Sequence, residues 1–167
     1  MNLVRGLAAV PLLSALALVG CESTNSEVAQ ASSKAPPAIF ASIENQSPVA
    51  IESLHGNPVL LEFWATWCAM CITAKPGVES ISREFSPQGL KVMAVTNEDA
   101  SKVKTWLEDN EMTLPIYLDA NGVGADMFQV VALPHAVVID REGSIVWRGD
   151  PRDEVSLREA VVTACNE

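Results

Sequence analysis

The sequence contains few aromatic residues and little positive charge. Aromatic residues make up 5% of its 167 residues, and 11 Lys and Arg stand against 21 Asp and Glu, for a formal net charge of −10. A protein that binds nucleic acid needs a basic face for the phosphates, so this balance argues against that class of partner. It also disfavours electrostatic docking on anionic lipid. Four cysteines are too few for a disulfide scaffold of this length.

The N-terminal apolar run is too short for a permanent membrane span. Residues 7–19 are uncharged and apolar, and at about 1.5 Å per residue they fall well short of the ~30 Å hydrocarbon core. The basic residue Arg5 precedes this run. This combination is typical of a secretory signal peptide, which we predict over residues 1–20.

The apolar run ends in Leu18-Val19-Gly20-Cys21, which resembles a bacterial lipobox. The resemblance implies that Cys21 is lipidated on its sulfur and becomes the mature N-terminus. An ordinary cleaved signal followed by a chance cysteine is the alternative. Acyl chains on Cys21 would anchor the protein on the extracytoplasmic, periplasmic side of a membrane, where disulfides form. Residues 21–38, rich in Ser, Ala and Pro, then predict a lipidated N-terminus with a flexible tether.

Strands alternate with helices over residues 39–167, which we predict to be one α/β domain. The expected strands are 39–43, 49–51, 59–64, 90–96, 115–118, 134–140 and 144–148. The expected helices are 69–85 (interrupted by Pro76), 100–110, 122–129 and a last one after Pro151. The last two strands flank a turn and predict an antiparallel hairpin. The pattern therefore predicts a central mixed β-sheet flanked by helices.

Cys68 and Cys71 form a Cys-x-x-Cys pair where a buried strand passes into a helix. A structural zinc site needs a second pair of ligands, and His55, His135 and Cys165 are isolated in sequence. A redox dithiol needs one sulfur at a helix N-terminus, where free N–H groups stabilise the thiolate, and a second sulfur one turn further along. The spacing therefore predicts Cys68 as the nucleophile and Cys71 as the resolving thiol.

The segment FWATWCAMC, with Pro76 five residues after Cys71, resembles the thioredoxin-like superfamily. Together with the lipobox, it is most similar to the extracytoplasmic TlpA/ResA branch. The resemblance implies a thioredoxin-like fold with a short N-terminal β extension, and thiol–disulfide oxidoreductase activity without a cofactor. It also implies that the partners are protein thiols and disulfides and a membrane electron donor.

Leu133-Pro134 matches a second family motif, a cis-proline that faces the dithiol and leaves nearby backbone free to hold substrate. A trans proline at a strand start is the alternative. The resemblance gives Trp67, Leu133, Pro134 and His135 as substrate-binding residues. The branch often has Thr at the position of His135. This histidine could tune Cys68 or contact substrate, and a solvated position at the rim is the alternative.

Glu62 is the only charge in residues 59–64. A buried acid is costly, so it must form a pair, stay protonated or take part in chemistry. By resemblance, Glu62 is a catalytic residue that carries the proton to and from Cys71. An edge position that reaches solvent is the alternative. Ala74 stands where some relatives in this branch have a helical Glu, which could leave Glu62 as the sole nearby acid.

Met70 departs from the family pattern, and the role of Cys165 is a separate question. Met70 stands where the family commonly has Pro before the second cysteine, and it restores a backbone N–H that proline lacks. We hypothesise that this donor stabilises the Cys68 thiolate and makes the disulfide more oxidising. Cys165 shares a helical face with Leu157 and Val161 and is predicted to pack in the core, and a third redox role is the alternative.

The favoured function is reduction of disulfides in extracytoplasmic proteins, because the TlpA/ResA resemblance outweighs the Met70 argument. A dithiol oxidase or isomerase remains an alternative, since dithiols of this type span about −270 to −120 mV. A Cu(I) metallochaperone is another alternative, with soft thiolates as ligands and His135 as a third. No resident metal is expected. The residues do not indicate the oligomeric state.

Overall fold

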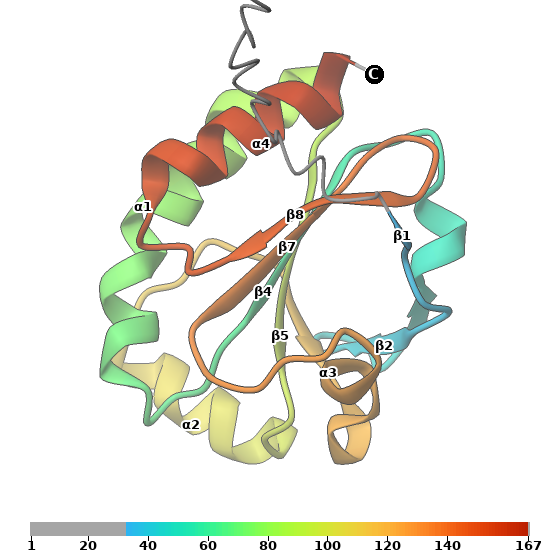
Figure 1. Cartoon of the computed structure of the whole chain (residues 1–167). Helices are drawn as coiled ribbons and strands as arrows, with labels where there is room; N and C mark the ends of the chain where they lie inside the picture. Colours follow the sequence, from blue (N-terminus) through green and yellow to red (C-terminus); the bar gives the residue numbers. More distant parts are fainter. Residues whose placement is uncertain (1–32, 167) are drawn as a thin grey trace, which may run out of the picture.

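The computed structural model describes residues 33–166 (Figure 1). The predicted signal peptide and Cys21 lie outside the described residues. The end of the predicted tether lies inside them. Ser33–Lys34 form strand β1, which pairs with a strand near the C-terminus, and Ala38 is buried. The described residues therefore include a strand about six residues before Ile39, where the sequence pattern placed the start of the domain.

Eight strands form one mixed sheet in the order β1-β8-β7-β4-β5-β6-β2-β3. The strands are β1 (Ser33–Lys34), β2 (Ile39–Ser42), β3 (Pro48–Ala50), β4 (Val59–Phe63), β5 (Lys91–Thr96), β6 (Ile116–Leu118), β7 (His135–Ile139) and β8 (Ser144–Gly149). The α-helices are α1 (Ala69–Phe85), α2 (Ala100–Asp109), α3 (Val123–Met127) and α4 (Glu154–Asn166). The chain thus has a thioredoxin-like α/β fold, as the sequence predicted, with strands added at both edges of the central sheet.

Strand β4 lies in the middle of the sheet and leads to the cysteine pair. All five of its residues are buried, which explains the nearly continuous apolar run, because a strand covered on both faces has no need of polar positions. It pairs in parallel with β5 and antiparallel with β7. Helix α1 provides the crossover that a parallel β4–β5 pair requires.

Two hydrophobic cores cover the two faces of this sheet. Leu60 and Trp64 pack toward α1, α2 and α4, while Leu61 and Phe63 pack on the opposite face, with residues of α3 and the N-terminal strands. Figure 1 shows α1 and α4 together on one side and α3 on the other. Because side chains alternate along a strand, Glu62 points to the same face as Leu60 and Trp64.

The remaining elements follow the sequence pattern with two differences. The β7–β8 hairpin is antiparallel, as predicted. Helix α1, which was expected to be interrupted, runs without a break through Pro76. Proline removes one backbone hydrogen bond, but Lys75, Gly77 and Val78 beside it are buried, and their packing holds the helix together. The expected helix 122–129 is shorter, because a 3-10 turn at Ala120–Gly122 precedes α3.

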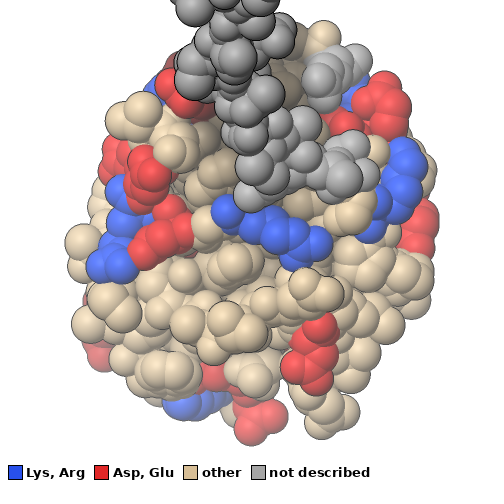
Figure 2. Space-filling view, in the orientation of Figure 1, with Lys and Arg blue, Asp and Glu red and all other residues tan. Residues whose placement is uncertain are grey.

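The surface of the described part has no broad basic face in the view of Figure 2, where small groups of acidic and basic side chains alternate. This distribution agrees with the acidic composition. Within residues 33–166, no helix combines the length and the apolar character that crossing a membrane would require.

Candidate active site around the Cys68–Cys71 disulfide

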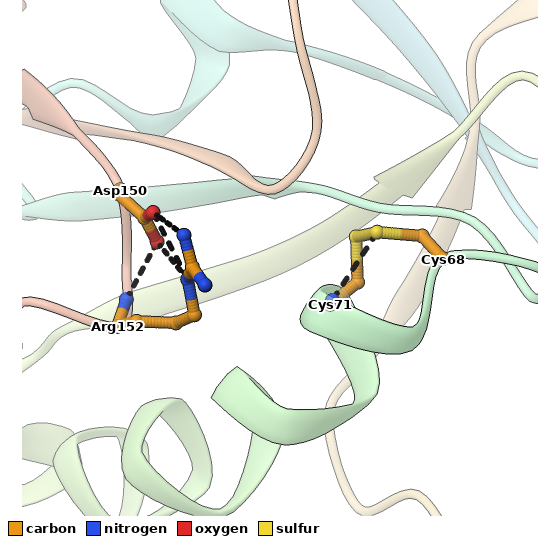
Figure 3. Close-up of polar contacts among 4 residues, drawn as sticks. All are labelled: Cys68, Cys71, Asp150 and Arg152. Atoms are coloured by element: carbon orange, nitrogen blue, oxygen red, sulfur yellow. Dashed lines mark hydrogen bonds and ion pairs between the residues drawn. A yellow bond between two sulfur atoms is a disulfide. The ribbon is translucent and has the colours of Figure 1, made fainter.

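Cys68 and Cys71 form a disulfide at the N-terminus of α1, with their Cα atoms 5.2 Å apart (Figure 3). The chain leaves β4 at Phe63 and reaches Cys68, the N-cap of α1, after a four-residue loop. The Cys71 N–H donates a hydrogen bond to Cys68 Sγ at 3.2 Å. Once the pair is reduced, this N–H and the positive end of the helix dipole favour a thiolate on Cys68. The structure thus joins the two cysteines of the motif at the start of the helix, while their redox role stays a prediction.

The two cysteines differ in their access to solvent, although both are buried. Cys71 is fully buried, and Cys68 retains 5% of its surface. The residues next to Cys68 are far more exposed, with Trp67 at 69% and Met70 at 48%. A partner therefore meets Trp67 and Met70 first and can reach only Cys68, which is what the assignment of nucleophile and resolving thiol requires.

The Leu133–Pro134 peptide bond is cis, as the family motif predicted. Pro134 is buried, and the strand that follows it begins with His135 paired opposite Phe63. This register places the cis-proline loop beside the end of β4, from which the cysteine loop departs. A cavity of about 390 Å³ opens between the two loops and α3, with Trp64, Trp67 and Leu133 among its lining residues.

His135 lies on the opposite face of the sheet from the buried Glu62. Residues directly opposite in an antiparallel pair share a face, so His135 lies with Phe63, while Glu62 lies with Ala136. His135 is half-buried, and its Nε2 is buried with no hydrogen-bond partner among the described residues. It is therefore not a fully solvated rim residue, and the register gives no support to direct tuning of Cys68.

Glu62 is fully buried and pairs with Lys75 of α1, whose Nζ lies 3.6 Å from Glu62 Oε2. Lys75 Nζ also lies 3.8 Å from the centre of the Trp64 ring, in a cation–π contact. Neither the Lys75 ammonium nor the two Glu62 oxygens have a hydrogen-bond partner among residues 33–166. Of the expectations for Glu62, pairing is the one that the structure shows, and the alternative of an edge position open to solvent is wrong.

Burial works against the charge on both members of this pair. Desolvation raises the pKa of Glu62 above its usual value, while Lys75 opposes this and Glu79 adds to it. Desolvation likewise lowers the pKa of Lys75, while Glu62 and Glu79 oppose it. Because the two groups interact at close range in a desolvated site, they titrate as a coupled pair.

Lys75 and Glu98 are two polar residues of the site that sequence reasoning missed. Lys75 lies four residues after Cys71 and three before Val78, so helical periodicity places it on the apolar face of α1, a signal that was available. Glu98 follows β5 and accepts hydrogen bonds from the backbone N–H and the hydroxyl of Thr66, in the loop before Cys68. No short-range pattern connects Thr66 with a residue 32 positions away.

Cys165 is the free cysteine of the described residues and packs in the core on the α1 side of the sheet. Burial raises the pKa of its thiol, and Arg141 opposes this. A thiol with a raised pKa is a poor nucleophile at neutral pH. The prediction of a core position is confirmed.

Metal ligation receives little support from the geometry. Residues 33–166 contain no group of three or more His, Cys, Asp or Glu side chains placed to hold a metal ion. The residue suggested as a third copper ligand, His135, shares its sheet face with Phe63, away from α1 and Cys71. The copper hypothesis therefore lacks its third ligand in this arrangement.

Sequence comparison places the chain among known proteins. A model of the AhpC/TSA family matches residues 32–148. The "Thioredoxin-like protein YneN" of Bacillus subtilis is 33% identical over 100 residues, which is 58% of this chain and 58% of the relative. The "Thiol-disulfide oxidoreductase ResA" of Oceanobacillus iheyensis is 29% identical over 102 residues, covering 60% of this chain and 53% of the relative. The chain thus spans a little over half the length of these two curated relatives.

Comparison with solved structures shows the same fold. The thioredoxin domain of a thiol-disulfide oxidoreductase from Bacteroides vulgatus superposes with a TM-score of 0.69 at 22% identity, covering 79% of this chain and 95% of that one. An exposed lipoprotein thioredoxin from Streptococcus pneumoniae superposes with a TM-score of 0.66 at 20% identity, covering 75% and 98%. At such identities the likeness establishes the fold alone.

Proposed function

Because the chain belongs to the AhpC/TSA family of thioredoxin-like proteins, we propose that it is a thiol–disulfide oxidoreductase whose working group is Cys68–Cys71. The observation that carries this proposal is the disulfide at the N-terminus of α1, beside the cis-Pro134 loop. Relatives named thiol-disulfide oxidoreductase match 60% and 74% of this chain.

The reaction proceeds in two exchange steps. The Cys68 thiolate attacks one sulfur of a substrate disulfide, forming a mixed disulfide and releasing the other substrate sulfur as a thiolate. Cys71 then loses its proton and attacks Cys68 Sγ. The Cys68–Cys71 bond forms, the bond between Cys68 and the substrate breaks, and the second substrate thiolate leaves. The substrate gains two electrons, which the dithiol loses, and a dithiol donor must later reduce Cys68–Cys71 again.

Substrate contacts in this proposal come from the two loops next to the disulfide. Trp67 is exposed and lines the cavity together with Leu133, so these two offer apolar contact to a polypeptide. Pro134 leaves the backbone beside it open to an extended segment, since proline has no N–H. His135 belongs to this set through its position directly after Pro134.

Reduction on the extracytoplasmic side of a membrane is the direction and location that we propose. The lipobox-like segment ending in Cys21 supports a lipid anchor, and a membrane protein that carries electrons would then be the donor of reducing equivalents. The resemblance of FWATWCAMC to the extracytoplasmic TlpA/ResA branch supports the same location. Metabolic labelling with a radioactive fatty acid tests the anchor, because Cys21→Ser must abolish incorporation.

Cysteine variants test the activity itself. Cys68→Ser must abolish insulin reduction in the presence of a dithiol donor. Cys71→Ser must accumulate a mixed disulfide with substrate, detectable by mass spectrometry, because resolution is blocked. The matched control is Cys165→Ser, which removes a buried thiol outside the disulfide and must retain exchange. Insulin reduction at the wild-type rate by Cys68→Ser would refute the proposal.

The reduction potential tests the direction. Equilibration with glutathione buffers, followed by quenching and mass spectrometry, measures the Cys68–Cys71 couple. A reductase is expected to lie nearer to about −270 mV, the value for thioredoxin. A value near about −120 mV, as for a strong oxidant of this fold, would overturn the reducing direction while leaving exchange activity intact.

A further inference from the structure

The cavity beside the disulfide has acidic residues that the exchange chemistry does not use. Its volume is about 390 Å³, and Trp67 and Leu133 connect it to the cysteine loop and to the cis-proline loop. Another part of its wall comes from the segment between the end of β6 and α3, which contributes Asp119, Asn121 and Asp126. The cavity therefore has apolar walls next to the disulfide and carboxylates at α3.

We propose that this cavity selects polypeptide substrates that carry a Lys or Arg close to the cysteine attacked by Cys68. The inference rests on the proposed exchange function and adds a preference for charge to it. The stem of the basic side chain lies along the apolar walls, and its cationic head lies near Asp119 and Asp126. The exchange steps themselves are unchanged.

Two apolar residues of the wall are largely open to solvent. Val131 is 95% exposed and Trp67 is 69% exposed, and both line the cavity. The methylene stems of Lys and Arg cover apolar surface while their charged heads stay in a polar environment. The face of a Trp ring also attracts a cation. These walls therefore suit a long basic side chain as well as they suit a neutral one.

The two acids of the wall provide the charge that favours a cation. Asp119 is 2% exposed, and its two carboxylate oxygens accept the N–H groups of Gly124 and Ala125, each at 2.8 Å. These bonds fix the carboxylate and leave further acceptor positions, since an ionised carboxylate has about four. Asp126 is exposed on α3. Within residues 33–166, neither acid forms an ion pair.

The chain itself places no cation in this cavity. Among the described residues that line it, none is Lys, Arg or His. Two cations of neighbouring segments are engaged elsewhere, since Arg148 donates to the Phe128 carbonyl and Lys102 pairs with Glu98. Opposite charges across an interface favour the correct partner, and like charges disfavour the wrong one. Positive charge in the cavity therefore has to come from the substrate.

The position of the cavity limits which substrate residue can reach it. Trp67 directly precedes Cys68, and Leu133 directly precedes Pro134. An extended segment advances about 3.3 Å per residue, and its side chains alternate in direction. A side chain about two positions from the substrate cysteine therefore points to the same side as that cysteine and reaches the cavity.

The test compares peptides that differ in one charge. Three peptides are identical except for Lys, norleucine or Glu two positions before a single cysteine, and a second set has the change two positions after it. Each cysteine is joined to thiopyridine, so that attack by Cys68 of the pre-reduced protein releases coloured thiopyridone. Rate constants are measured at about 0.15 M salt, where charges more than about 8 Å apart are largely screened.

In one of the two sets, the wild type is expected to react about fivefold faster with the Lys peptide than with the norleucine peptide, and more slowly with the Glu peptide. Asp126→Asn must reduce the Lys preference, and Asp126→Lys must reverse the order of the Lys and Glu peptides. Glu159→Gln is the matched control. It removes an exposed acid from α4, on the other face of the sheet from α3 (Figure 1), and must keep the wild-type preference.

Equal rates for the Lys and Glu peptides in both sets overturn the proposal and leave exchange itself intact. A Lys preference that persists unchanged in Asp126→Lys also overturns it, because the preference then comes from the net charge of the protein. If Asp126→Lys does not fold, Asp126→Asn decides in the same way. Failure of the exchange function is detected separately, because Cys68→Ser would then release thiopyridone from all peptides as fast as the wild type.

Discussion

Glu98 holds the loop that precedes Cys68 through two hydrogen bonds to Thr66. Its carboxylate accepts the Thr66 N–H at 2.6 Å and the Thr66 hydroxyl at 2.9 Å, and it forms an ion pair with Lys102 of α2. Thr66 is two residues before Cys68. The loop leaving β4 is thereby attached to the end of β5 and to α2, which limits how far Cys68 can move.

Replacing Glu98 should weaken both the fold and the exchange reaction. Because hydrogen bonds to charged groups contribute about 1.5–3 kcal/mol, Glu98→Ala should lower the free energy of unfolding by about that amount. It should also slow exchange, because the Cys68 loop is released. Urea unfolding and insulin reduction measure the two effects. Glu108→Ala, an exposed acid on α2, is the control and should change neither. Unchanged stability of Glu98→Ala would contradict this account.

The pKa of Glu98 predicts that the stability of the fold depends on pH. Burial raises the pKa of Glu98, but hydrogen bonds from Lys102 and Thr66 outweigh burial, and the pKa lies below its usual value of 4.5. A carboxyl group with a lowered pKa stabilises the fold above pH 4.5 and loses that contribution as the pH falls through its folded-state value. Glu98→Gln should therefore lose less stability than the wild type on acidification below pH 4.5.

The Glu62–Lys75 pair should respond more strongly to the loss of one charge than to the loss of both. Removing one partner leaves a buried charge without compensation, which costs about 3–5 kcal/mol. Glu62→Gln and Lys75→Met should each destabilise the protein by about that much. The double variant Glu62→Leu/Lys75→Met should recover most of the loss, because no charge stays buried. Urea unfolding of the four proteins measures this, and additive losses in a matching Glu62→Leu cycle would contradict it.

The sequence predicts most of the path from β4 to α1 because local patterns determine it. A five-residue buried strand, two cysteines at a helix start and a proline motif are all short-range features. The contacts that complete the site join residues that are far apart in the sequence. Lys75 reaches Glu62 only because α1 packs on β4, and Glu98 reaches Thr66 across 32 residues. Such pairs depend on tertiary packing, which single-residue patterns do not encode.

The sequence pattern also does not predict the position of the His135 side chain. Its place after Pro134 suggests a residue near the dithiol, but strand register decides the face on which its side chain lies. Pairing with Phe63 places it on the side of Phe63 and Val137, away from Glu62. The extra strand β1 was missed for a related reason, since two residues are too short to show an alternating pattern.

His135 predicts a loss of stability in mildly acidic solution. Burial lowers its pKa below the usual value of 6.5, Arg148 adds to this, and Asp150 opposes it. Between its lowered folded-state pKa and 6.5, the unfolded chain binds more protons than the folded one, so stability falls as the pH falls through that range. His135→Gln should flatten this slope in thermal melts. A slope for His135→Gln equal to that of the wild type would contradict this prediction.

The hypothesis about Met70 predicts how the residue before Cys71 affects the pKa of the Cys68 thiol. Cys71 N–H already donates to Cys68 Sγ, and the backbone N–H of Met70 lies in the same first turn of α1, where such groups lack partners inside the helix. Met70→Pro removes this N–H and should raise the pKa of the Cys68 thiol in the reduced protein, because less positive potential faces the thiolate. Met70→Ala keeps the N–H and is the control. Thiolate absorbance followed against pH measures both, and equal pKa values for the two variants would refute the hypothesis.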